Sequence, residues 1–156
     1  MKIASTFLMC VICIQLFACS KNNKMEHSKN SNINSNIDTT KMKITIGTNT
    51  FIAKFYNNAT ATAFKAMLPM TLNMTELNGN EKYFDLPNAL PANPSNPVTI
   101  QNGDLLLYGS NTFVLFYKAF STSYSYTRIG GIKNPSGLAA ALGSGNTMVK
   151  FESGEK

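Results

Sequence analysis

The chain has 156 residues, with 14 lysines and arginines against 8 acidic residues and a formal net charge of +6 at pH 7. Much of the positive excess lies before residue 42, so a nucleic-acid-binding protein is poorly supported. All three cysteines lie at or before Cys19 and the one histidine is His27. The rest of the chain therefore has no disulfide, no thiol or imidazole nucleophile, and no thiolate or imidazole metal ligand. We expect neither a metal site nor a cofactor.

An apolar segment covers residues 7–18 and follows the positive charge of Lys2. It is shorter than the roughly 20 residues of a membrane-spanning helix and has the length of a signal-peptide core. It ends in "LFAC", which resembles the lipobox of bacterial lipoproteins. That resemblance implies a lipoprotein signal peptide over residues 1–18, cleavage before Cys19, and lipidation of Cys19. An ordinary secretory signal and a short uncleaved anchor are the alternatives.

Residues 19–41 are rich in asparagine, serine and lysine and show no helical or strand period. Such a segment buries too little apolar surface to fold, so we expect a disordered tether that carries the lipid at its start. The lipoprotein resemblance implies a lipid-anchored protein of the bacterial cell envelope, with the membrane as its partner. Because Ser20 and not aspartate follows the cysteine, the periplasmic side of the outer membrane is expected if the host has two membranes.

One folded domain is expected over residues 42–152, with a short tail at 153–156. Alternating or apolar runs bounded by turn residues predict about eight strands. The predicted strands cover residues 42–46, 50–56, 70–76, 81–86, 104–108, 112–120, 125–132 and 147–152. The proline-rich segment 86–97 is expected to be an extended loop.

Two helices are predicted between the strands. The first covers residues 58–68, with Asn58 as its N-cap. The second covers residues 134–143, with Asn134 as N-cap, Pro135 in the first turn and Gly143 after the last. This pattern is mainly β and fits a closed barrel or a sandwich, and the periodicity alone does not choose between them.

Three blocks decide the choice: residues 42–87, "GDLLLYGSNTFVLFYKAF" and "SYSYTRIGGI". Together they resemble the small bacterial cyclophilin-like proteins over the whole domain. The resemblance implies a closed eight-stranded β-barrel with two short helices. True cyclophilins are peptidyl-prolyl isomerases, but the segments that carry their catalytic residues are absent here, and the arginine of this chain comes late. The catalytic residues are therefore unknown.

Arg128 is the only arginine of the chain. In a strand, Tyr124, Tyr126 and Arg128 share one face, and arginine beside tyrosine can stack and present a planar donor fork. Gly130 and Gly131 would let a ligand or another backbone approach. We take Arg128, Tyr126 and Tyr124 as candidate ligand-binding residues. The alternative is that Arg128 pairs internally with an acidic residue, for which Glu81, Asp85 and Asp104 are the candidates, or that its side chain extends into solvent at the surface.

Two further residues join the candidate ligand-binding set. Phe113 and Tyr117 are expected on one face of their strand, and Phe116 and Phe120 on the opposite face. One pair is expected in the core and the other pair lining a pocket, and Phe116 is taken as the candidate pocket residue. Glu81 is the second addition. It also flanks a turn together with Glu76, where both acids are expected to be solvated, and a paired-carboxylate hydrolase is the weaker alternative.

These observations predict a cell-envelope lipoprotein whose barrel binds a small ligand or a proline-containing peptide. A divergent peptidyl-prolyl isomerase and a structural, partner-docking lipoprotein are the alternatives, so enzymatic activity stays open. The oligomeric state does too.

Overall fold

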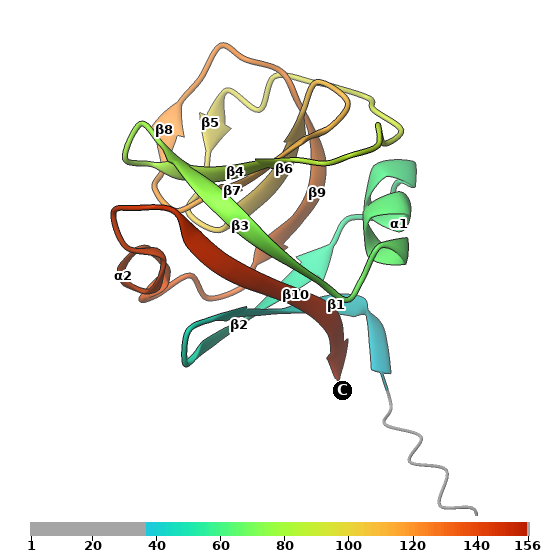
Figure 1. Cartoon of the computed structure of the whole chain (residues 1–156). Coiled ribbons are helices and arrows are strands. Elements are labelled where there is room, and N and C mark those ends of the chain that lie inside the picture. Colours follow the sequence, from blue (N-terminus) through green and yellow to red (C-terminus); the bar gives the residue numbers. More distant parts are fainter. Residues whose placement is uncertain (1–36, 156) are drawn as a thin grey trace, which may run out of the picture. The chain divides into compact units, whose positions relative to one another are not determined.

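The computed structural model describes residues 37–155. Eight strands form a closed antiparallel barrel in the order β1-β10-β3-β4-β7-β6-β9-β2, and β5 and β8 form a separate ribbon (Figure 1). The predicted closed eight-stranded barrel with two short helices is confirmed. Its elements are β1 (Ile37–Ile46), β2 (Asn49–Phe55), α1 (Ala59–Ala66), β3 (Met70–Leu77), β4 (Glu81–Asp85), β5 (Thr99–Ile100), β6 (Asp104–Tyr108), β7 (Thr112–Phe116), β8 (Phe120–Ser121), β9 (Tyr126–Ile132), α2 (Leu138–Leu142) and β10 (Thr147–Glu155). No helix within these residues is long and apolar enough to cross a membrane.

The strands at the two ends of the domain are longer than predicted. β1 begins at Ile37, inside the expected tether, and β10 runs to Glu155, which pairs with Ile37. A pairing partner thus orders a segment whose polar composition alone predicts a coil. The expected signal peptide, Cys19 and the rest of the expected tether lie outside the described residues.

The two helices differ in how well their ends were predicted. Asn58 caps α1 as expected, since its side chain accepts a hydrogen bond of 2.8 Å from the backbone of Ala61. The prediction for α2 was wrong at its start, because its N-cap is Gly137 with φ 80°. Asn134 instead accepts a bond of 3.2 Å from the backbone of Ser136, forming a turn before the helix.

Apolar side chains fill the inside of the barrel and also cover one outer region. Phe64 from α1 packs against Phe113 in the interior, with ring centroids 4.5 Å apart. The other face of β6, β7 and β9 carries what we call the outer cluster, and the β5–β8 ribbon adds Ile100 and Phe120 to it. The buried members of the outer cluster are Ile100, Leu106, Val114, Phe116 and Tyr126. The predicted division of Phe113 and Tyr117 from Phe116 and Phe120 is confirmed.

A bulge interrupts the ladder between β6 and β9. Leu105 pairs with Gly130, but its neighbour Leu106 pairs with Arg128, so Ile129 is the extra residue. Gly130 is needed here because a Cβ atom on it would lie 2.7 Å from the carbonyl oxygen of Lys54. The sequence predicts that a ligand or another backbone approaches this glycine, and the structure shows the backbone of Lys54 there.

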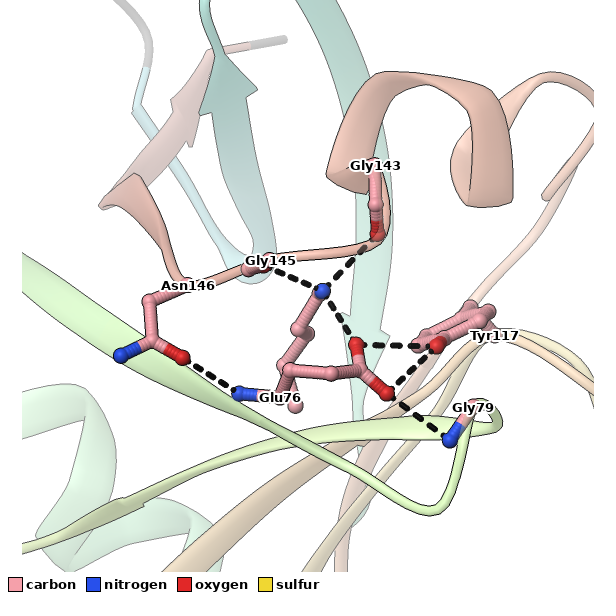
Figure 2. A network of polar contacts seen from close by, with 7 residues as sticks. Glu76, Gly79, Tyr117, Gly143, Gly145 and Asn146 are labelled. Carbon is pink, nitrogen blue, oxygen red and sulfur yellow. Dashed lines mark hydrogen bonds and ion pairs between the residues drawn. The ribbon is translucent and has the colours of Figure 1, made fainter.

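A buried lysine, Lys82, joins two segments of the barrel through hydrogen bonds. Lys82 of β4 has a fully buried side chain, and its ammonium group donates to the carboxylate of Glu76 and to the carbonyl oxygens of Gly143, at 2.9 Å, and Gly145, at 2.6 Å (Figure 2). These three acceptors satisfy all three of its protons. The contacts join the β3–β4 hairpin to the segment that follows α2.

Glu76 is the centre of this network and is not the solvated acid that the sequence predicts. Its two carboxylate oxygens each lie 2.9 Å from the hydroxyl of Tyr117, and the backbone of Gly79 donates at 2.9 Å (Figure 2). Burial by itself raises the pKa of Glu76, but the hydrogen bonds from Lys82, Tyr117 and Gly79 outweigh it and hold the pKa below its usual value of 4.5.

This network predicts a pH-dependent contribution to stability. A carboxyl group whose pKa is lowered by folding stabilises the fold above its unfolded pKa, and the contribution is lost as the pH falls through the folded pKa. At neutral pH we expect Glu76→Gln to lower the free energy of unfolding by about 1.5–3 kcal/mol, as for other hydrogen bonds to charged groups. The deficit should shrink as the pH falls below about 4.5, measured by urea unfolding.

Glu152→Gln is the matched control for this experiment. Glu152 also pairs with lysines, Lys43 at 3.2 Å and Lys150 at 2.7 Å, but at the surface. Its substitution should cost less than about 1 kcal/mol. A deficit for Glu76→Gln that stays constant from about pH 7 to about pH 3 would contradict the assigned role.

Gly130 offers a second test of the fold. Gly130→Ala forces a Cβ atom against the backbone of Lys54, and we expect a loss of about 1–3 kcal/mol in the free energy of unfolding. Gly131→Ala is the control, because no atom lies within 4 Å of the Cβ it would add. Equal losses in the two variants would show that the close approach is not the cause.

Candidate functional site

A pocket of about 410 Å³ lies against the outer face of β4, β6, β7 and the start of β9. We call it the tyrosine pocket. Its ten lining residues are Leu77, Asn78, Glu81, Tyr83, Asp85, Tyr108, Thr112, Val114, Tyr124 and Tyr126. Four tyrosines and two carboxylates thus share one concave surface.

Strand register explains why these residues meet. Glu81, Tyr83 and Asp85 alternate along β4, so all three face outward, opposite to the buried Lys82. Across the sheet Asp85 pairs with Thr112. Thr112 in turn pairs with Tyr108, and Tyr108 with Tyr126 of β9. A single row across four adjacent strands therefore forms one side of the pocket.

The tyrosine rings stand against one another at defined angles. Tyr108 and Tyr124 meet edge to face, with centroids 6.0 Å apart and an interplanar angle of 88°. Tyr126 packs beside Tyr108 at 5.6 Å and rests on Phe116 at 5.7 Å. Tyr126 is buried, whereas Tyr108 and Tyr124 are 46% and 60% exposed. The pocket therefore has a rigid inner ring and two open outer rings.

The two carboxylates of the pocket differ in their surroundings. Asp85 is exposed and accepts a bond of 2.7 Å from the hydroxyl of Thr112. Glu81 is half-buried, and no group within residues 37–155 forms a hydrogen bond or ion pair with its carboxylate. Burial raises the pKa of Glu81, and the nearby charge of Glu76 raises it further. Glu81 is thus a negative group without a local partner.

Three of the five residues predicted to bind ligand come together in the tyrosine pocket: Glu81, Tyr124 and Tyr126. Phe116 is fully buried beneath Tyr126 and supports the pocket without lining it. Arg128 lies elsewhere, in a second pocket of about 350 Å³ beside the start of α1. Whether each of these residues binds a ligand stays a prediction.

Arg128 does stack on a tyrosine, but the partner is Tyr56. Its guanidinium carbon lies 5.5 Å from the centre of that ring, and its Nη1 atom donates to the hydroxyl at 3.1 Å. In the described part of the chain no carboxylate forms an ion pair with it, so the expected alternative of internal pairing is not observed. The side chain is exposed.

Sequence reasoning missed Tyr83, Asp85 and Tyr108 as pocket residues. The two-residue period that places Tyr124 and Tyr126 on one face also places Glu81, Tyr83 and Asp85 on one face of their strand. The sequence pattern could therefore have grouped these three residues. The pairing of β4 with β7 and of β6 with β9 supplies the rest, and it joins segments that are far apart in sequence. No group of three or more acidic, cysteine or histidine side chains in residues 37–155 is placed to hold a metal ion.

Comparison with known proteins identifies a structure of similar fold and a family to which the sequence belongs. The fold of the chain is similar to that of a hypothetical protein from Archaeoglobus fulgidus, whose structure was determined in solution and of which the match covers 95%. The match covers 74% of this chain with a TM-score of 0.51 and 17% sequence identity, which is a likeness of fold alone. No curated protein matches the sequence. The model of the cyclophilin-like family matches residues 44–152, and the chain belongs to that family.

Proposed function

We propose that this protein is a ligand-binding module whose site is the tyrosine pocket. The observation that carries the proposal is a pocket of about 410 Å³ whose lining includes exposed tyrosines and the half-buried carboxylate of Glu81, which has no partner in the described part of the chain. Pockets of about 300–1,000 Å³ lined by aromatic residues with a few polar groups are typical of small-ligand and peptide sites. Its ligand is a small molecule or a short peptide segment, including one that contains proline.

The exposure of Tyr108 and Tyr124 supports this proposal. Each ring leaves about half of its surface in water, at 46% and 60%, directly beside the buried outer cluster. Tyrosine can be covered by a ligand at little cost in side-chain entropy, because only two torsions are lost. The neighbouring strands hold the inner wall rigid, so binding requires little rearrangement of the barrel.

Prolyl isomerisation is the alternative, and the geometry supports it less well. Such catalysis depends on a donor that stabilises a twisted amide beside an apolar pocket for the proline ring. Arg128 does not line the tyrosine pocket, and its guanidinium group is engaged with Tyr56. Membership of the cyclophilin-like family supports the fold and leaves the activity to be tested.

We further propose that Cys19 carries a lipid that anchors the domain in the bacterial cell envelope, at the outer membrane if the host has two. The support is the apolar segment 7–18 followed by "LFAC". A lipid at Cys19 would leave the residues before β1 as a spacer between membrane and barrel. The binding pocket would then act on ligands or partners at the membrane surface.

Tyr124→Ala tests the binding site. The full chain is screened by thermal denaturation against short peptides, including proline-containing ones, and against small metabolites, since a ligand of the folded state raises the melting temperature. We expect the affinity for each confirmed ligand to fall about tenfold or more in Tyr124→Ala, because an exposed aromatic wall is lost. Stability should change by less than about 0.5 kcal/mol, because the ring is mostly exposed.

Tyr56→Ala is the control, because Tyr56 is a similarly exposed ring, at 41%, outside the tyrosine pocket. Ligands that bind Tyr124→Ala normally but fail to bind Tyr56→Ala would place the site beside Arg128 instead. Prolyl isomerase turnover that Arg128→Ala abolishes would replace the binding module with an enzyme.

Lipidation is tested in a bacterium that expresses the full chain with labelled palmitate. We expect the chain to take up the label and to sediment with membranes, and Cys19→Ala to lose both properties completely. Cys13→Ala, a substitution within the apolar segment, should retain both. Uptake of the label by Cys19→Ala would overturn the anchor assignment.

A further inference from the structure

We infer that the tyrosine pocket selects an organic cation, an alkylammonium group held between tyrosine faces and the carboxylate of Glu81. This inference rests on the proposed function and names the chemical class of its ligand. The alkylammonium group belongs to a free amine or to a lysine side chain of a peptide, and the experiment below distinguishes these two sources.

Charge is the first argument. Glu81 and Asp85 line the pocket, and none of its ten lining residues is a lysine, arginine or histidine. The nearest lysine on β4, Lys82, points to the opposite face and is held by Glu76. A chain with a net charge of +6 therefore presents a negative concave surface here, which attracts cations and repels anions.

The missing partner of Glu81 is the second argument. Other acidic side chains in the described part of the chain have partners: Glu76 and Glu152 pair with lysines, and Asp104 accepts a bond of 2.8 Å from the backbone of Gln101. Glu81 is half-buried without one. Desolvating a carboxylate without compensation costs free energy, which a bound ammonium group would recover through a charge-assisted hydrogen bond.

The tyrosines are the third argument. The face of an aromatic ring is negative and attracts ammonium groups within about 6 Å of its centre. Tyr108 and Tyr124 meet at 88°, so their faces form two walls of a corner. The charge of Glu81 acts on the hydroxyl of Tyr126, since it contributes, after burial, to raising the pKa of that group. Carboxylate and rings therefore act on the same space.

A metal cation is the competing occupant, and the donor set disfavours it. Hard metal ions need about six oxygen ligands and prefer several carboxylates, whereas only two of the ten lining side chains are carboxylates and four are tyrosines. Within residues 37–155 no three acidic, cysteine or histidine side chains are gathered for such an ion. Ring faces suit a large, weakly hydrated organic cation better.

The test compares probes of equal shape and different charge on the full chain. Butylammonium is paired with 1-butanol, in which a hydroxyl group replaces the ammonium group, and capped lysine amide with capped norleucine amide. Tyrosine fluorescence follows binding, because the chain has six tyrosines and no tryptophan, and four of the tyrosines line the pocket. We expect at least one charged probe to bind about tenfold more tightly than its neutral partner.

Glu81→Gln should remove the preference for the charged probe, whereas Glu152→Gln should retain it. Because Glu81 has no partner to lose, Glu81→Gln should keep the fold and raise the melting temperature at neutral pH. Tyr124→Ala provides a second variant, which should weaken binding of the charged probe. Tighter binding of lysine amide than of butylammonium identifies a peptide side chain as the source, and the reverse identifies a free amine.

Failure of the inference and failure of the proposed function give different results. Three results would overturn the inference that the pocket selects a cation. They are equal binding of charged and neutral probes, a preference for the charged probe that Glu81→Gln retains, and no binding of any probe. If Tyr124→Ala still weakens ligands from the general screen, the binding site stands without the cation. If no ligand depends on Tyr124, the proposed function falls as well.

Discussion

Closure of the eight-stranded sheet is the constraint on which the rest of the molecule depends. A closed barrel has one inner face, and here large side chains such as Phe64, Phe113 and Phe151 fill it. Residues on the alternate positions must then face outward. On β6, β7 and β9 these positions are also apolar, so the outside carries a second cluster, to which Ile100 and Phe120 of the β5–β8 ribbon contribute. The tyrosine pocket shares Val114 and Tyr126 with this cluster.

The two glutamates of the β3–β4 hairpin, Glu76 and Glu81, point to opposite sides of the sheet. Glu76 pairs across the hairpin with Lys82, and Leu77 pairs with Glu81, so the two acids differ by one position in register and face opposite sides of the sheet. Inside, Glu76 meets a lysine and a tyrosine hydroxyl (Figure 2). Outside, Glu81 lines the tyrosine pocket and pairs with no cation in the described part of the chain. The proposed ligand would supply the partner that Glu76 already has.

Local patterns predicted much of the fold, and contacts between distant segments limited the rest. The turn residues and two-residue periods placed the hairpins, and Asn58 correctly marked the start of α1. Arg128 was grouped with Tyr124 and Tyr126 because a regular strand would align them. In the structure Arg128 does stay in regular register with Tyr126 on β9, but its side chain stacks on Tyr56 and lines a different pocket, and no sequence pattern relates Arg128 to Tyr56. The Lys82 network joins residues 76, 82, 117 and 143–146, which no periodicity relates.

The position of β10 in the barrel limits the stage of synthesis at which the barrel can close. β10 lies between β1 and β3 in the barrel but follows all other strands in the chain. Until it emerges from the ribosome, β1 and β3 each expose an unpaired edge, and the barrel cannot close. Pairing of Ile46 with Val149 also requires closing a very long loop, which slows folding. The barrel can therefore close only after β10 has been synthesised, so the last strand of the chain sets the earliest point at which the whole fold forms.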